Sequence, residues 1–308
     1  MYIPKYDGNI HPDEWINDIH NYYRKENIEE NEYLHYAIPL VDPIIKLPSR
    51  INSFEKLCSA LKDDISFTVF KNTNLRKLRL LKYVPEREGG ETSKFISNFR
   101  KLCYNAEIND IEKQNKYLLL SLPNDYFITE FLWRNKNIKT MNELIKEFEE
   151  IVMDDSNLIR NGSIVALKHV STRKYLSSIN NSFYKTGSKS QLVFANNLLD
   201  SNALWKITFA SCKELASYTE NYISLLHKNS NIFLGVNENN ISPFINRKLA
   251  DCLGYLKSND VIYLSINQVY LRSHDFHFTI GFDTFQEVAC HSEIQYNYNY
   301  EWCIELIK

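Results

Sequence analysis

The chain has 308 residues, of which 44% are hydrophobic, and its 36 basic against 38 acidic side chains leave a formal net charge of −2. This length predicts two domains, and the near-neutral charge argues against a domain built as a whole to bind nucleic acid. No apolar run approaches the roughly 18 residues of a membrane span, and the charged N-terminal segment does not read as a signal peptide. Six cysteines without a C-x-x-C pair are typical of reduced thiols, so we expect a cytoplasmic protein.

Residues 1–158 predict a helical domain, because apolar side chains recur there at helical spacing. The first helix begins at Pro12, with acids in its first turn and an apolar stripe that includes Trp15. A polar hinge at 86–90 divides the domain into lobes of about 1–84 and 91–155. The apolar stripe of the helix at 52–70 is Phe54, Leu57, Leu61, Ile65 and Val69. The other predicted helices cover 31–41, 73–83, 92–104, 110–120, 127–133 and 141–152.

Residues 159–308 predict an all-β domain, because short β-branched or aromatic runs alternate there with Asn, Ser and Gly clusters. Basic and acidic side chains are nearly equal in number in each part of the chain, so neither part is a polyelectrolyte. The strand candidates are 164–170, 191–195, 205–209, 222–227, 261–266, 269–272 and 302–307.

An internal repeat in the second domain narrows the choice of fold. Segments that start at Leu167 and Leu225 share a His two places on, an aromatic residue at +8 and a Leu at +9. A weaker third copy starts at Leu271. The aromatic residues that close the three copies are Trp205, Tyr263 and Trp302. Three four-strand units predict a β-trefoil. The alternative, a β-sandwich, would not require a threefold sequence repeat.

Two segments of the first β copy carry a family resemblance. G-S-I-V-A-L-K-H-V-S-T-R-K-Y-L-S-S at 162–178, followed by D-S-N-A-L-W-K-I-T at 200–208, resembles a MIR domain. This is the trefoil module of protein O-mannosyltransferases, inositol trisphosphate and ryanodine receptors, and stromal-cell-derived-factor-type proteins. The match is better over 162–209 than over 210–308. It implies a non-catalytic module that serves as a folding, ligand-contact or partner-contact surface, and it does not imply which ligand is bound.

The first domain also carries a resemblance, spread over several passages in order. These passages are I-P-K-Y-D-G at 3–8 with Trp15 and Ile16, the helix at 54–70, G-E-T-S-K-F-I-S-N-F-R-K-L at 90–102, and L-L-L-S-L-P at 118–123 with 127–153. Together they resemble the capsid part of gypsy-type retrotransposon Gag proteins, which implies a bilobed helical domain that self-associates or binds a partner. The chain has no zinc knuckle, no aspartic protease motif and no polymerase, which puts genome packaging in doubt.

A basic stretch without an intervening acid is the one candidate contact patch in the first domain. Its residues are Lys71, Arg76, Lys77, Arg79 and Lys82. Clustered Lys and Arg gain counterion-release energy on RNA phosphates or on an acidic partner. The alternative is the solvated face of an amphipathic helix, which we favour because the domain has a slight acidic excess.

Several histidines and a cysteine could be combined into a zinc site. His274, His277, Cys290 and His291 are the candidates, but the H-x-x-H spacing does not fix a tetrahedral geometry, so we predict no metal. His169 and His227 occupy equivalent positions of the repeat, which predicts a structural role.

The aromatic residues are predicted to be structural. Tyr and Asn alternate at 296–300, a pattern that favours a strand with one buried face over a stacking surface. The four tryptophans, Trp15, Trp133, Trp205 and Trp302, are predicted to be core residues.

The sequence predicts no catalytic residues, no cofactor and no enzyme activity. It holds no nucleophile elbow, P-loop or dinucleotide-binding fingerprint. The favoured function is an interaction protein of retroelement ancestry, with a self-associating or partner-binding helical domain and a ligand-binding trefoil. The alternatives are a retroelement capsid protein that builds shells and holds RNA, and a cytosolic carbohydrate-binding trefoil.

Overall fold

The computed structural model describes residues 5–184, 190–209, 214–215, 223–235, 244–247, 254–266, 269–280, 282–292 and 298–308. The chain forms two compact units, Met1–Val152 and Met153–Lys308, which we call the helical unit and the β unit. The helical unit contains the described α-helices, including most of the last one, Met141–Asn157. The β unit contains every strand among the described residues. The architecture is therefore mixed α plus β, with the two classes of element in successive parts of the chain.

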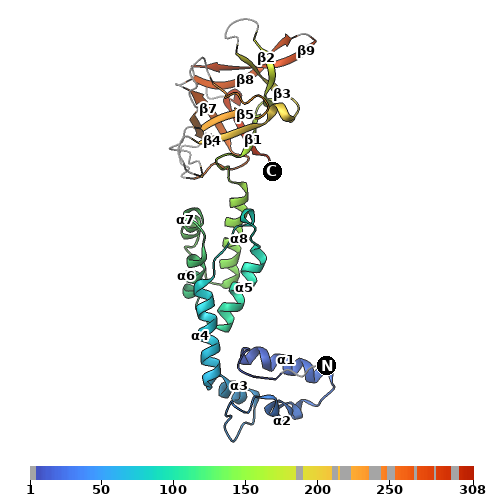
Figure 1. The fold of residues 1–308 in the computed structure, drawn as a ribbon, viewed down its shortest axis with the longest axis vertical. Coiled ribbons are helices and arrows are strands. Elements are labelled where there is room, and N and C mark those ends of the chain that lie inside the picture. Colours follow the sequence, from blue (N-terminus) through green and yellow to red (C-terminus); the bar gives the residue numbers. More distant parts are fainter. Residues whose placement is uncertain are drawn as a thin grey trace. The chain divides into compact units, whose positions relative to one another are not determined.

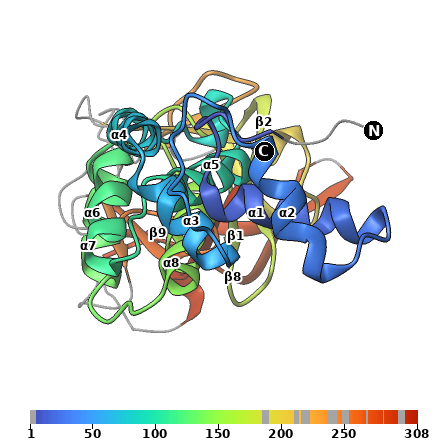
Figure 2. The same ribbon diagram turned by 90° about the horizontal axis from the view of Figure 1, so that it is seen from below.

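The first helices of the helical unit lie close together (Figures 1 and 2). They pack around an aromatic and aliphatic core. The core holds Trp15 and Ile19 from the first helix, with Leu57 and Leu61 from the third. The helix predicted over 31–41 is only a short α-helix flanked by two 3₁₀ turns. The elements are α1 (Pro12–Lys25), η1 (Glu30–Glu32), α2 (Tyr33–Ala37), η2 (Ile38–Leu40) and α3 (Phe54–Asp63).

The single helix predicted over 52–70 is wrong, because the chain breaks at Asp64. Asp64 has an extended backbone, and its side chain accepts a hydrogen bond from the backbone N–H of Ser66, which caps the next helix, α4 (Ile65–Leu80). This helix absorbs most of the separate helix predicted at 73–83. The break turns Ile65 and Val69 to solvent, where they are 72% and 55% exposed, so the predicted buried stripe ends at Leu61.

The remaining helices agree with the predicted ranges within a few residues, except at the last C-terminus. Tyr83 lies at the centre of their core, with its ring edge-on to Phe95, Phe127 and Phe148 at centroid distances of 5.1, 5.5 and 5.0 Å. The Tyr83 and Thr92 hydroxyls are hydrogen-bonded at 3.0 Å. The elements are η3 (Glu86–Glu88), α5 (Thr92–Asn105), α6 (Ile111–Ser121), α7 (Asp125–Arg134) and α8 (Met141–Asn157).

The β unit is one antiparallel sheet, wound so that its last strand pairs with its first. The order is β10-β7-β8-β9-β3-β2-β1-β4-β5, with β10 also on β1 and β6 on β7. Strands are present at all seven candidate segments from 164–170 to 302–307 but not at 298–300, and β2, β6 and β9 were not predicted. The bounds are β1 (Ile164–His169), β2 (Tyr175–Phe183), β3 (Gln191–Asn196), β4 (Trp205–Phe209), β5 (Ile223–His227), β6 (Phe244–Arg247), β7 (Val261–Ile266), β8 (Val269–Ile280), β9 (Asp283–His291) and β10 (Trp302–Leu306).

The register of the third copy of the repeat differs from the prediction. The indole N–H of Trp302 donates to the carbonyl of Leu271 at 3.2 Å, as that of Trp205 donates to Leu176 at 2.9 Å. Leu271 therefore corresponds to Leu176 in the second strand of the first copy, rather than to a first-strand residue. Tyr263 lies in β7, which pairs with β10 as β1 pairs with β4, so it belongs to a first strand rather than a closing one.

Candidate functional site

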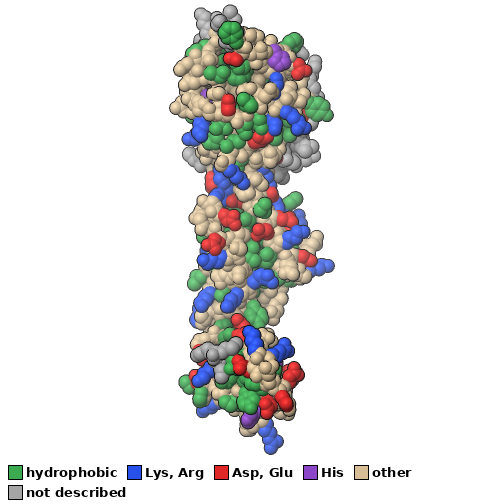
Figure 3. Space-filling view, turned by 90° about the vertical axis from the view of Figure 1, so that its right-hand side faces the viewer, with side chains coloured by type: hydrophobic (Ala, Val, Ile, Leu, Met, Phe, Trp, Pro, Cys, Tyr) green, Lys and Arg blue, Asp and Glu red, His purple; other side chains and the backbone are tan. Residues whose placement is uncertain are grey.

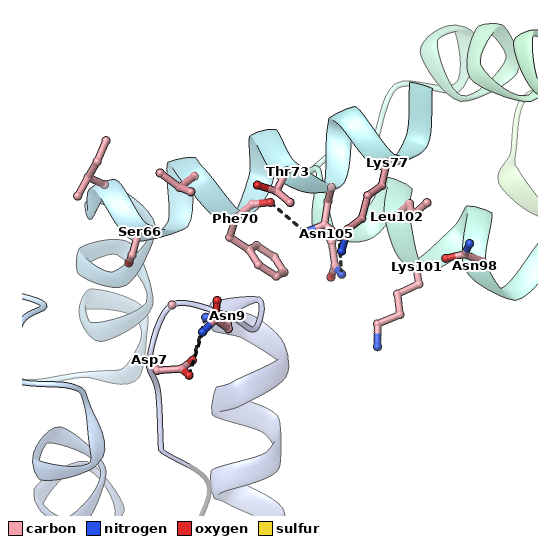
Figure 4. Close-up of a pocket in the computed structure, with 14 residues that line it drawn as sticks. Asp7, Asn9, Ser66, Phe70, Thr73, Lys77, Asn98, Lys101, Leu102 and Asn105 are labelled. Carbon is pink, nitrogen blue, oxygen red and sulfur yellow. Dashed lines mark hydrogen bonds between the residues drawn. The ribbon is translucent and has the colours of Figure 1, made fainter. Parts of the chain in front are cut away.

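A groove in the helical unit is lined mostly by polar and charged side chains. It has a volume of about 570 Å³ and lies between the Asp7–Asn9 turn, α4 and α5. Figure 4 shows the Phe70 ring and the Lys101 side chain directed into this space, with Asp7 and Asn9 on the facing wall. We call this site the α4–α5 groove. Its lining comprises Asp7, Gly8, Asn9, Ile65, Ser66, Val69, Phe70, Thr73, Asn74, Lys77, Asn98, Lys101, Leu102 and Asn105.

A close backbone approach at Gly8 forms one wall of the groove. Gly8 has φ +83°, and a Cβ there would lie 2.7 Å from the Cβ of Ser66. Only glycine combines this backbone conformation with so short a distance to the first turn of α4. The turn is held on its other side by Asp7, whose carboxylate accepts from the backbone and side-chain N–H groups of Asn9 at 2.9 and 3.0 Å.

Two ammonium groups face the groove without a partner in the described part of the chain. Lys77 on α4 and Lys101 on α5 are both exposed, and neither forms an ion pair or hydrogen bond there. The single lining carboxylate, Asp7, is occupied by Asn9, and these hydrogen bonds hold its pKa below the usual range, so it stays charged. The lining thus carries one net positive charge, and its two cations are available to a ligand.

Amide side chains form the wall between the two helices. Asn74, 6% exposed, donates to the carbonyl of Phe70 at 2.9 Å, and Asn105, 5% exposed, donates to the Asn74 side-chain oxygen at 3.5 Å. The side-chain oxygen of Asn105 and the hydroxyl of Ser66 have no hydrogen-bond partner among the described residues. A wall with unsatisfied polar atoms is unusual, because buried polar groups are nearly always paired.

The predicted basic patch is divided by the structure. Lys71 pairs with Glu107 at 3.3 Å, Lys82 donates to the carbonyl of Leu120 at 2.6 Å, and Arg76 donates to the Thr73 hydroxyl at 3.2 Å. Of the five residues, Lys77 alone lines the α4–α5 groove, while Arg79 is exposed elsewhere on α4. On the face seen in Figure 3, basic and acidic side chains are interspersed over the helical unit.

A charge cluster joins α3 and α4 to the end of α5. Lys62 lies 3.0 Å from Asp13 and 3.2 Å from Glu107, and the ring of buried His11 lies 3.9 Å from the same Glu107 carboxylate. Burial alone would raise the pKa of Glu107, but the hydrogen bonds from Lys62 and Lys71 hold it below its usual value. Burial lowers the pKa of His11, so the ring is neutral near neutral pH. Sequence spacing gave no signal for this cluster, because its members come from distant segments.

Cys58 lies beside this cluster and is not activated. Its Sγ donates to the Asp13 carboxylate at 2.8 Å, and burial together with that carboxylate raises the thiol pKa to about 12. Cys103, Cys290 and Cys303 are likewise unpaired, and burial raises the pKa values of Cys103 and Cys303 as well. Cys212 and Cys252 lie outside the described residues.

The two repeat histidines of the β unit are fully engaged in structural hydrogen bonds. The Nε2 atoms of His169 and His227 lie 2.9 and 3.1 Å from the carbonyls of Asn299 and Asn202. Their Nδ1 atoms lie 2.9 and 2.8 Å from the hydroxyls of Thr172 and Ser230. Each ring also packs against a tryptophan at a centroid distance of 5.0 Å. The arrangement supports the predicted structural role.

The zinc candidates do not form a metal centre in the described part of the chain. His274 lies 3.5 Å from Glu287, while His277 lies 3.4 Å from the ammonium group of Lys174. No group of three or more His, Cys, Asp or Glu side chains among the described residues is arranged to hold a metal ion.

One predicted core residue is wrong, and one predicted strand is only partly described. Trp133, near the end of α7, is 69% exposed, whereas Trp15, Trp205 and Trp302 are buried as predicted. Tyr298 to Tyr300 form a 3₁₀ turn instead of a strand, and Tyr296 lies outside the described residues.

None of the helices described here combines the length and hydrophobicity that a membrane crossing requires.

Comparisons with known proteins assign no family. No protein-family profile and no curated protein sequence matches the chain. Among solved structures, an SDF2-like protein from Arabidopsis thaliana is similar at 20% identity and TM-score 0.40, over 48% of this chain and 94% of that one. A Caenorhabditis elegans protein with unknown function gives 17% identity and TM-score 0.41, over 49% and 98%. The protein O-mannosyltransferase complex of S. cerevisiae bound to the sugar donor gives 15% identity and TM-score 0.40, over 79% and 41%.

Proposed function

We propose that the chain is a non-enzymatic binding protein whose helical unit self-associates or holds a partner and whose β unit recognises a ligand. One observation carries the proposal: Leu132 and Trp133, adjacent on α7, are 54% and 69% exposed. An indole is among the costliest side chains to leave in water, and tryptophan is enriched at the centres of protein interfaces. Leu120, the end residue of the neighbouring apolar run on α6, is 50% exposed as well.

The helical unit supports a capsid-like arrangement of Gag type. The hinge predicted at 86–90 forms a tight turn between α4 and α5. The unit has two sets of buried aromatic residues, one that includes Trp15 and one in which Tyr83 packs on Phe95, Phe127 and Phe148 from across the hinge. Retroelement ancestry would explain why helices of this kind present apolar side chains for self-association.

The β unit supports a MIR-like trefoil. The sheet closes on itself through the β1–β10 pairing. Equivalent Trp hydrogen bonds occur at the closing strands β4 and β10, and equivalent His hydrogen bonds occur at β1 and β5. In such a module the repeated polar side chains hold the frame, so recognition falls to the connecting loops. A protein or glycan ligand fits this division of roles.

A binding role without catalysis also fits the protonation state of the cysteine thiols. Burial raises the pKa values of Cys58, Cys103 and Cys303, which keeps them as thiols, and thiols are poor nucleophiles. Unpaired thiols are typical of reducing compartments, which supports a cytoplasmic location.

Size-exclusion chromatography with light scattering on the full chain tests self-association. We expect a mass above the 36.3 kDa of one chain, and we expect Leu132→Ser with Trp133→Ser to return it to that value. Ile44→Ser is the matched control, because Ile44 is 86% exposed in the same unit but does not belong to α7 or α6. A wild-type monomer would overturn self-association.

The same runs distinguish the capsid alternative. Large particles with a high 260/280 nm absorbance ratio that shrink in high salt would show a shell that holds RNA. A glycan array probed with the full chain tests the carbohydrate alternative, and binding there would assign the ligand of the β unit.

A further inference from the structure

We propose that the α4–α5 groove binds a small phosphate ester of mononucleotide size. The site is separate from Leu132 and Trp133, on which the proposed function rests. Its volume of about 570 Å³ lies in the range of small-molecule sites, roughly 300–1,000 Å³. Its lining combines cations, amides and apolar side chains in one cavity.

The two free ammonium groups assign the charge of the ligand. Lys77 and Lys101 reach the groove from different helices and have no carboxylate partner among the described residues. By contrast, Lys62 and Lys71 in the same unit each form an ion pair with Glu107. Because Asp7 is held by Asn9, it does not neutralise either lysine. An anion between Lys77 and Lys101 would gain charge-assisted hydrogen bonds from both.

The rest of the lining favours an ester with a planar, polar group over a bare anion. Phe70 and Leu102 supply an apolar surface, and Figure 4 shows the Phe70 ring directed into the space opposite Asn9. Amides present a donor and an acceptor together, which suits the edge of a nucleobase. The unpaired side-chain oxygen of Asn105 lies in this wall, and a small rotation of the amide would offer it to a ligand donor. An aromatic ring, amides and cations in one groove match the three parts of a nucleotide.

Isothermal titration calorimetry on the full chain at 150 mM NaCl tests the site, with adenosine 5′-monophosphate as the probe. We expect saturable one-site binding that Lys77→Ala and Lys101→Ala each weaken about tenfold, as loss of a charge-assisted hydrogen bond requires. Adenosine, which lacks the phosphate, should bind at least tenfold more weakly.

Two matched variants separate this site from general surface charge. Arg79→Ala removes an exposed cation from α4, and Lys94→Ala removes one from α5, and neither residue lines the groove. We expect both to bind the probe like the wild type. Thermal unfolding monitored by circular dichroism should give all four variants the wild-type midpoint, because all four side chains are exposed.

Four results would overturn the proposal. The first is no heat of binding at millimolar probe, and the second is equal loss in the groove variants and their controls. The third is equal affinity for adenosine, which would remove the role of the phosphate. Binding of an eight-residue oligoadenylate without binding of the mononucleotide would also reject a small ligand and identify an RNA strand instead. None of these results depends on the mass measured for the proposed self-association.

Discussion

His169 and His227 make the same set of contacts in two successive copies of the repeat. Each Nε2 donates to a backbone carbonyl, each Nδ1 meets a hydroxyl three residues on, and each ring packs on a tryptophan. The residue after each hydroxyl, Arg173 or Asn231, has a positive φ. Two distant segments thus build one local structure, in which the histidine joins its own turn to the 3₁₀ turn in front of a closing strand, β10 for His169 and β4 for His227.

This relationship predicts a pH dependence of stability. Burial lowers the pKa of both histidines in the folded protein, so the unfolded chain binds more protons below its own His pKa of about 6.5. Stability is therefore lost as pH falls through that value towards the lower folded pKa. Urea unfolding from pH 7.5 to 5.0 should show this loss, and His169→Gln with His227→Gln should reduce its slope. His35→Gln, at an exposed site, should leave the slope unchanged.

Glu107 should stabilise the helical unit through its three cationic or imidazole neighbours. It has a left-handed backbone with φ 54°, which costs a non-glycine residue about 1 kcal/mol, and its carboxylate receives Lys62 and Lys71. Because the groups are about a third exposed, Glu107→Gln should lower the free energy of unfolding by only about 1–2 kcal/mol. A double-mutant cycle with Lys62→Met measures the coupling.

Salt and a control variant check this interpretation. The effect of Glu107→Gln should shrink at 1 M NaCl, because ions screen partly exposed charges. Glu112→Gln, on an exposed face of α6, should change the free energy of unfolding by less than about 0.5 kcal/mol. A coupling energy of zero between Glu107 and Lys62 would contradict the assigned role.

Gly90 should be required for the turn between α4 and α5. A Cβ at Gly90 would lie 1.8 Å from the carbonyl oxygen of Val84, a backbone atom that cannot move aside freely. Gly90→Ala should therefore cost about 2–3 kcal/mol in urea unfolding followed at 222 nm. Gly89→Asn is the control, because a Cβ there meets nothing and Asn tolerates its φ of +87°. Equal effects of the two substitutions would show that the short distance is relieved at little cost.

Local patterns predicted most of the elements, and failed where capping and packing decide. The helices from 92 onward follow their apolar spacing because each buries a single stripe. The break at Asp64 carried a sequence signal that spacing alone concealed: an acidic residue in front of Ile65 is a favoured N-cap. The third copy of the repeat was misaligned because its first strand, β7, has no histidine marker. Ile262 pairs with Trp302 as Val165 pairs with Trp205, which places Ile266 where the first copy has His169.

The α4–α5 groove could not be predicted from spacing in the sequence. Lys77 was found as part of a basic stretch, but its partner in the groove, Lys101, lies on another helix and joins it only through packing of α4 on α5. Asp7 and Asn9 reach the same space because Gly8 permits close contact with Ser66. The groove depends on tertiary structure, which brings these distant residues together. The repeat histidines could be found from the sequence because they occur at the same position in two copies of the repeat.

Truncation of Trp15 should lower the free energy of unfolding strongly, whereas truncation of Trp133 should hardly change it. Trp15 is 1% exposed and packs on Tyr6 at a centroid distance of 5.3 Å, so Trp15→Ala should cost about 3–5 kcal/mol in the free energy of unfolding. Trp133 is 69% exposed, so Trp133→Ala should change it by no more than about 0.5 kcal/mol at a concentration where the chain is monomeric.

Concentration separates a surface role for Trp133 from a structural one. If Trp133 lies in an interface between copies, the wild-type unfolding midpoint rises with protein concentration, because association stabilises the folded state by mass action. Trp133→Ala should abolish that rise while leaving the dilute midpoint unchanged. A large loss of stability in the dilute variant would contradict the exposed position and return Trp133 to the core that the sequence pattern predicts.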